Sequence, residues 1–163
     1  MTVIAYDGKW IAADRQSNSG NLVYPSTKLR RLDNGEVIAS TGYVDTCTAI
    51  ENWYAGGADL DRYPQGQADK ERYAVLVVVS TEGVWEYVAA PARIPIEGPF
   101  HAWGSGCEVA FGLLAAGRSA VEAVETAIHY CHACGLGIDA IELATGKCER
   151  YSIESRLVKR IAW

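Results

Sequence analysis

The sequence has no long hydrophobic run, although 49% of its 163 residues are apolar. No window approaches the roughly 18 to 20 apolar residues that a helix needs to cross a bilayer. The start of the chain also lacks the charged segment and apolar stretch that mark a secretory signal. The sequence therefore predicts a cytoplasmic protein that does not associate with a membrane.

Basic patches and paired cysteines are also scarce. Fifteen Lys and Arg residues stand against twenty Asp and Glu residues, for a formal charge of −5, and the basic residues form no stripe. A surface that neutralises nucleic-acid phosphates needs such a stripe, so we expect no nucleic-acid partner. The five cysteines are an odd number without a secretion signal, which favours free thiols over a disulfide framework. We expect one globular domain over residues 1–163.

The first hydrophobic segments, MTVIAY and KWIAAD, flank Asp7-Gly8. An Asp-Gly pair between two β-favouring runs is typical of a two-residue hairpin turn. Counting outward from that turn pairs Thr2 with Ala13. The hairpin therefore places Asp14 beside the start of the chain.

Further along, strand-like and helical segments alternate. Residues 15–21 have the composition of a loop, and DLDRYPQGQADKER, at 59–72, can hold at most a short helix. Ser119 and Glu122 form a capping box at the start of a helix. We expect further strands over 22–32, 36–41, 74–80, 84–90, 138–143 and 147–153, and helices over 44–55, over 107–116 and from Ser119 onward. The apolar strand 74–80 should lie in the middle of a sheet. This order indicates helices that cover sheets.

Four short motifs occur in this order: Thr2 ahead of the first strand, AAD in IAADRQ, the lysine of STKLRRL followed by STG, and GSG in WGSGCEVAFGLLAAG. Together they make the chain resemble the family of proteasome β-subunits and HslV-type peptidases, which are N-terminal nucleophile (Ntn) hydrolases. The resemblance implies an α+β fold of the Ntn-hydrolase type, a four-layer αββα sandwich.

The resemblance also implies an active site. It places the nucleophile on Thr2, the acid on Asp14, the lysine on Lys28, the oxyanion-hole amide on Gly42 and a helper serine on Ser105. It further implies a substrate pocket lined by Ser40 and Val44, which we expect to be neither charged nor large.

The chemistry of the terminal threonine agrees with these roles. Once Met1 is removed, Thr2 carries a hydroxyl and a free α-amine, which together are a nucleophile and its base. The amine has a reference pKa of about 7.7 to 8.0, and the charge of Lys28, held by Asp14, would lower the pKa values of both groups on Thr2. This interpretation needs no cofactor and no metal.

The predicted function is cleavage of peptide or amide bonds by a proteasome-like threonine hydrolase. The resemblance implies a homo-oligomer, with a ring and an ATPase partner as options. Two alternatives stay open: a catalytically silent scaffold or binding subunit of the same fold, and a small-molecule amidase. If Thr2 is left out of account, the pair Asp14 and Lys28 could be an ordinary surface ion pair. Ser105 could simply cap a helix.

Two segments depart from the family pattern. In HYCHACG, Cys131 or His132 stands where relatives carry an aspartate, and Cys134 stands in place of a serine. One CxxC motif supplies half of a zinc site, so we expect thiols and no zinc. Cys131 lies on the apolar stripe of its helix and should be buried, whereas Cys134 should lie in a loop beside the nucleophile. The second departure is the shortened segment 58–71, where relatives have a long helix.

Overall fold

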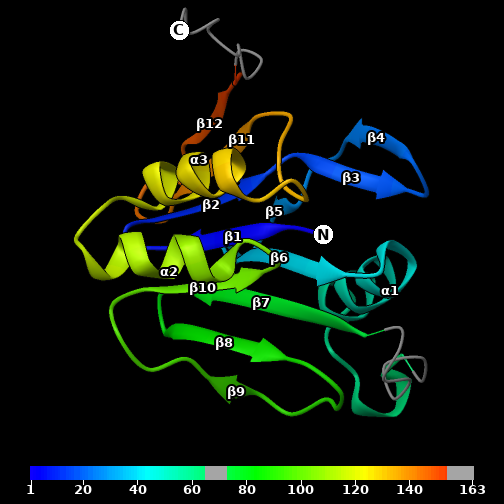
Figure 1. The fold of residues 1–163 in the computed structure, drawn as a ribbon. Helices are drawn as coiled ribbons and strands as arrows, with labels where there is room; N and C mark the ends of the chain where they lie inside the picture. Colours follow the sequence, from blue (N-terminus) through cyan, green and yellow to red (C-terminus); the bar gives the residue numbers. More distant parts are fainter. Residues whose placement is uncertain (65–72, 154–163) are drawn as a thin grey trace, which may run out of the picture.

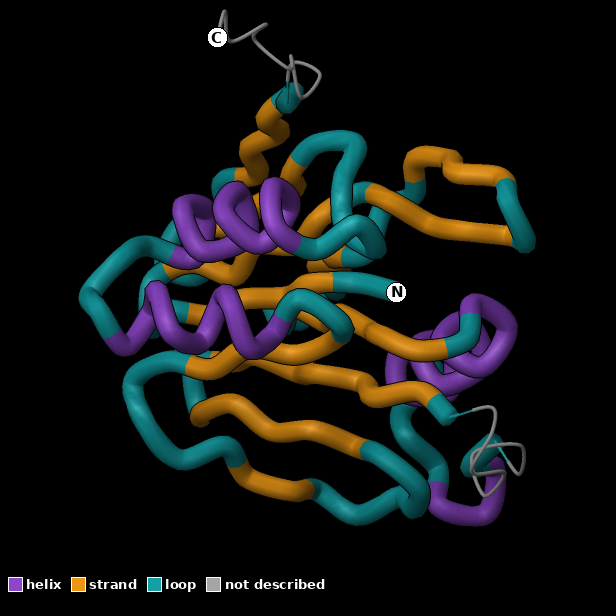
Figure 2. The backbone as a smooth tube through the Cα atoms, viewed as in Figure 1, coloured by secondary structure: helices purple, strands orange, loops and turns teal. Residues whose placement is uncertain are grey.

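The computed structural model describes residues 1–64 and 73–153 (Figures 1 and 2). The helices are α1 (Val44–Ala55), α2 (Cys107–Ala115) and α3 (Ala120–Tyr130), with a 3₁₀ turn at Leu60–Arg62. The strands are β1 (Val3–Tyr6), β2 (Trp10–Asp14), β3 (Gln16–Ser19), β4 (Leu22–Pro25), β5 (Leu29–Arg31), β6 (Val37–Gly42), β7 (Ala74–Ser80), β8 (Gly83–Tyr87), β9 (Ile94–Pro95), β10 (His101–Gly104), β11 (Ile138–Glu142) and β12 (Cys148–Tyr151).

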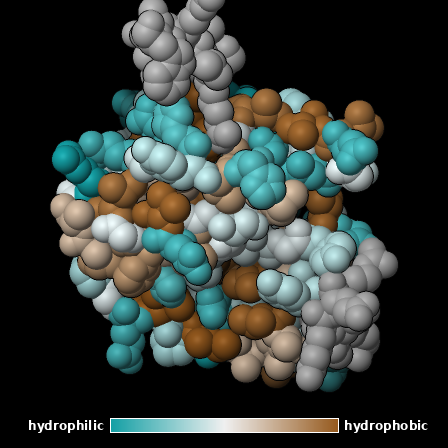
Figure 3. Space-filling model, viewed as in Figure 1, coloured by the Kyte–Doolittle hydropathy of each residue, from teal (hydrophilic) through white to brown (hydrophobic). Residues whose placement is uncertain are grey.

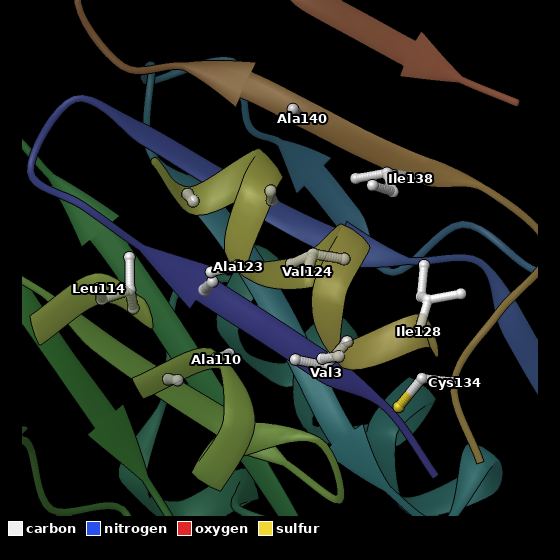
Figure 4. Packing of buried hydrophobic residues seen from close by; sticks show 14 residues of the cluster. Val3, Ala110, Leu114, Ala123, Val124, Ile128, Cys134, Ile138 and Ala140 are labelled. Atoms are coloured by element: carbon white, nitrogen blue, oxygen red, sulfur yellow. The ribbon is translucent and has the colours of Figure 1, made fainter. Parts of the chain in front are cut away.

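Two five-stranded antiparallel sheets form the centre of the molecule. Their strand orders are β10-β1-β2-β11-β12 and β5-β6-β7-β8-β9. Helices α2 and α3 pack on the first sheet, and α1 packs on the second. One hydrophobic cluster lies under α2 and α3 (Figure 4), a second lies between the sheets, and a third lies under α1. The predicted α+β class and its four-layer αββα arrangement are confirmed.

Strand β7 illustrates how the sequence builds these layers. Val77 and Val79 point into the cluster between the sheets, and Leu76 and Val78 point into the cluster under α1. Each fully buried side chain of this type contributes about 1.5 to 3 kcal/mol. The run AVLVVVS therefore needs apolar residues on both of its faces, and β7 lies in the middle of its sheet, as predicted.

The start of α3 is fixed by two acidic side chains. Ser119 and Glu122 form the predicted capping box, in which each side chain accepts a hydrogen bond from the other residue's backbone N–H. Asp7, in the β1–β2 turn, accepts a further bond from the Ala120 N–H at 2.8 Å. These contacts pair the otherwise unsatisfied amides of the first helical turn and tie the helix to the hairpin.

The register of the β1–β2 hairpin differs from the prediction. Ile4 pairs with Ala13, and the three residues from Asp7 to Lys9 connect the strands. The Asp7 carboxylate accepts hydrogen bonds from the backbone N–H groups of Lys9 and Trp10, which stabilises this longer turn. The predicted two-residue turn is therefore wrong, although Asp14 does lie beside the start of the chain.

Three other expectations are wrong at the level of single elements. Residues 15–21 are not simply a loop, because Gln16–Ser19 form β3, which pairs with β4 in a separate two-stranded sheet that extends from the body (Figure 1). The single strand expected over 22–32 is two strands, separated by residues 26–28. The short strands β9 and β10 were not predicted. The shortened segment 58–71 lies partly outside the described residues.

Candidate active site

The start of the chain, the β3–β4 hairpin and α1 line a cleft. Figure 1 shows where these three elements lie. The volume of the cleft is about 1040 Å³. Six of the seven residues predicted for the site line this cleft: Thr2, Lys28, Ser40, Gly42, Val44 and Ser105. The seventh, Asp14, is fully buried next to Lys28. The fold thus brings together segments that lie more than 100 residues apart.

Asp14 ends β2 and accepts four hydrogen bonds. Its Oδ1 accepts from Lys28 Nζ at 2.8 Å and from the Val3 N–H at 2.9 Å. Its Oδ2 accepts from the N–H groups of Gln16 and Gly135, both at 3.0 Å. Burying a carboxylate is costly unless charge and hydrogen bonds compensate, and here both do. Because the two side chains are 0% and 7% exposed, the alternative of a surface ion pair is wrong.

Lys28 connects this buried carboxylate to the start of the chain. Its Nζ also donates to the Met1 carbonyl oxygen at 3.2 Å. The Thr2 hydroxyl donates to the same oxygen at 2.6 Å. The ammonium and the hydroxyl therefore meet at one acceptor, on the N-terminal side of Thr2.

Gly104 and Gly106 pack against Thr2, and Gly42 packs against Tyr73. At Gly42 (φ +136°), a Cβ would lie 2.3 Å from the Tyr73 carbonyl oxygen, and at Gly104 (φ +88°) it would lie 2.3 Å from that of Thr2. The Gly106 N–H donates to the Thr2 carbonyl at 3.2 Å. Packing alone therefore requires glycine at positions 42 and 104. Gly104 and Gly106 were not predicted to position Thr2, although both belong to the GSG motif.

Ser105 is exposed and lines the cleft between these two glycines. The N-cap residue of α2 is Gly106, and no side-chain hydrogen bond caps this helix. The alternative that Ser105 caps the helix is therefore wrong.

Of the two cysteines of HYCHACG, Cys131 is less buried than expected, and Cys134 lies in the loop after α3, where it is buried. Cys134 is buried behind β1, where a Cβ on Gly106 would touch both its sulfur and Val3 (Figure 4). Cys131 is half-buried at the C-cap of α3. The pKa of the Cys134 thiol is raised far above its ordinary value. Burial is the largest cause, followed by the charge of Asp14 and a hydrogen bond with Cys131. A thiol held protonated in this way is a poor nucleophile at neutral pH.

A carboxylate in the cleft wall was also missed. Glu51 lines the cleft together with Cys47 and Thr48, on the same face of α1 as Val44. The expectation of an uncharged, small pocket is therefore wrong. These positions are three or four residues apart along the predicted helix, and this spacing could have shown that they lie on one face of it.

Residues 1–64 and 73–153 contain no group of three or more His, Cys, Asp and Glu side chains that could hold a metal ion. In the same part of the chain, no helix has the length and apolar character needed to span a membrane.

No family model and no curated protein matches this sequence. Solved structures do match. BPH from Thiobacillus denitrificans in complex with epoxomicin has a TM-score of 0.66 at 19% identity, over 94% of this chain and 100% of that chain. A second structure of the same BPH scores 0.65 over the same shares. The eukaryotic HslV from Trypanosoma brucei scores 0.61 at 21% identity, over 86% of this chain and 98% of that one. The protein therefore has the Ntn-hydrolase fold of HslV and proteasome subunits.

Proposed function

We propose that this protein is a proteasome-like N-terminal threonine hydrolase that cleaves peptide or other amide bonds after Met1 is removed. The observation that carries the proposal is the buried Asp14–Lys28 ion pair, whose ammonium meets the Thr2 hydroxyl at the Met1 carbonyl. Apolar side chains of similar size could fill this space without the cost of burying two charges, so the pair favours a catalytic subunit over a silent scaffold.

Removal of Met1 would convert the Thr2 nitrogen from an amide to an amine. This amine would accept the hydroxyl proton while Thr2 Oγ1 attacks the carbonyl carbon of the substrate. The tetrahedral intermediate would then expel the amine half of the substrate, which leaves with a proton, and an ester on Thr2 would remain. Water would hydrolyse this ester and regenerate the hydroxyl.

The other cleft residues would support these steps. The fixed charge of Lys28 would favour the deprotonated form of the hydroxyl and the unprotonated amine. A backbone N–H at Gly42 is our candidate for the donor to the oxyanion, because preorganised donors give large rate effects. Ser105, at the rim of the cleft, is our candidate partner for the terminal amine.

A matched pair of variants tests the nucleophile. Thr2→Ser keeps the hydroxyl and Thr2→Ala removes it, and all three second residues are small enough for removal of Met1. Intact mass would first establish the N-terminus of each protein. We expect wild type and Thr2→Ser to hydrolyse fluorogenic peptides, and Thr2→Ala to be inactive with an unchanged melting profile. We also expect epoxomicin, the compound bound to the Thiobacillus neighbour, to inhibit the wild type.

The proposal fails if the Thr2→Ala protein is as active as the wild type. It also fails if wild type that lacks Met1 hydrolyses no peptide. Activity on small amides without activity on peptides would support the amidase alternative, and inactivity on both would support the silent subunit.

A further inference from the structure

One face of α1 forms a wall of the cleft. Val44, Cys47, Thr48 and Glu51 are spaced by three or four residues, and all four line the cleft. At 1.5 Å per residue, Glu51 lies about 10 Å further along the helix than Val44. The wall therefore begins next to Gly42, beside the proposed reaction centre, and ends at a carboxylate.

Glu51 is half-buried and has one neutral hydrogen-bond donor. The hydroxyl of Ser40, which also lines the cleft, donates to Glu51 Oε1. Burial raises the pKa of the Glu51 carboxyl, and the Ser40 hydrogen bond and the charge of Arg30 partly oppose this change. Arg30 lines a different cavity, and no ion pair to Glu51 falls within 4 Å among residues 1–64 and 73–153. Within the described part of the chain, the negative charge of Glu51 is therefore only partly compensated, by the Ser40 hydrogen bond and the more distant charge of Arg30.

The charges of the described lining residues favour a cation. They are the positive charges of Lys28 and of the N-terminal ammonium on Met1, and the negative charges of Asp45 and Glu51. Lys28 is neutralised by Asp14, and Glu51 is the carboxylate on the α1 wall. Low-dielectric walls focus such a field into the cleft, so that a positive group is attracted and a negative group is repelled.

We propose that Glu51 selects substrates that carry a lysine- or arginine-like side chain on the acyl side of the bond to be cleaved. This inference rests on the proposed function, which places the scissile carbonyl near Gly42 and Thr2. A long cationic side chain could then extend along the α1 wall, with its apolar stem against Val44 and its charged end at Glu51. A guanidinium would meet the carboxylate in a charge-assisted hydrogen bond.

The test compares hydrolysis of two peptides that differ only in Arg or Leu before a fluorogenic leaving group. The variant is Glu51→Gln, whose amide oxygen can still accept from Ser40. We expect wild type to prefer Arg, and the Arg-to-Leu ratio of kcat/KM to fall about 10- to 100-fold in Glu51→Gln, as for loss of a charged hydrogen bond. Glu125→Gln makes the same charge change outside the cleft and should keep the wild-type ratio. An unchanged ratio in Glu51→Gln would overturn the inference and leave the hydrolase intact.

A binding measurement separates this inference from the proposed function. We would titrate N-acetyl-arginine amide and N-acetyl-leucine amide into wild type and Glu51→Gln and follow backbone amide NMR shifts around residue 51. We expect tighter binding of the arginine amide to wild type and loss of that difference in Glu51→Gln. Such binding without any hydrolysis would support the cation site and refute the hydrolase. Equal affinity for the two amides would refute the cation site.

Discussion

The hydrogen bonds at Asp14 make Lys28 a structural residue as well as a proposed catalytic one. Lys28→Met would remove the charge and leave the Asp14 carboxylate buried without its counter-ion. We expect the free energy of unfolding to fall by about 3 to 5 kcal/mol. We also expect kcat/KM to fall by on the order of 10² or more. Urea unfolding and peptide hydrolysis measure the two effects.

Lys9→Met is the matched control for this change. Lys9 pairs with Glu142 at 3.6 Å on the surface, where its side chain is 69% exposed. A surface pair contributes about 0 to 1 kcal/mol. Equal losses of stability in the two variants would contradict the account of the buried pair.

Glu51 should make stability depend on pH. Since burial raises its native pKa, the native state holds this proton at pH values where the unfolded chain, with a reference pKa of about 4.3, has lost it. The stability that this proton contributes is fully present below the unfolded pKa and is lost as pH rises through the native pKa. Glu51→Gln removes the titration, so its stability relative to wild type should increase as pH rises above about 4 and then level off. Urea unfolding over a pH series measures this difference, and a constant difference would contradict the prediction.

At the scale of single residues, the order of short motifs selected residues that the fold brings close together. Thr2, Lys28, Gly42 and Ser105 all line one cleft. The supporting contacts could not be predicted in this way. The Gly135 N–H reaches Asp14 across 121 positions of sequence, and Glu51 faces the cleft only because of how α1 packs. Such contacts depend on tertiary packing, which local patterns do not encode.

At the scale of elements, helices were predicted better than strands. The predicted bounds of α1 agree with the structure because apolar spacing and the Gly-Gly stop are local signals. The β1–β2 register differed because the Asp7 side chain stabilises a longer turn. Strand β10 is only four residues long and is held by pairing with β1. Pairing partners rather than propensity determine such strands.

The capping box of α3 gives a test at this scale. Ser119→Ala would remove the acceptor for the Glu122 N–H. We expect a loss of about 1 kcal/mol, or roughly 2 to 4 °C in Tm for a chain of this size. Thr126→Ala, later in the same helix, alters a side chain that donates to the Glu122 carbonyl and should change stability by less than about 0.5 kcal/mol. A thermal melt that ranks the two variants the other way would contradict the assignment of the cap.

At the scale of the whole molecule, hydrophobic side chains are unevenly exposed. Figure 3 shows hydrophobic atoms over the β3–β4 hairpin, where Leu22, Val23 and Tyr24 are exposed. Exposed apolar residues that gather in this way often mark an interaction surface. The BPH and HslV neighbours share this fold over 94% and 86% of the chain.

We therefore predict that the protein forms a homo-oligomer in solution. Light scattering coupled to size-exclusion chromatography at micromolar concentration measures its mass. A monomer would contradict the prediction and would favour the silent-subunit or small-amidase alternatives over a ring peptidase.

The four hydrogen bonds to Asp14 join the beginnings of β1 and β3, the link before β5 and the loop after α3. These four segments are far apart in the sequence, and contacts between distant parts of a sequence form slowly. We therefore expect the Asp14 carboxylate to be enclosed late in folding. In the folded protein, the same junction should open as one cooperative unit. Hydrogen–deuterium exchange of the Val3, Gln16 and Gly135 amides should then report one common free energy of opening. Lys28→Met should lower this free energy by the same amount at all three amides.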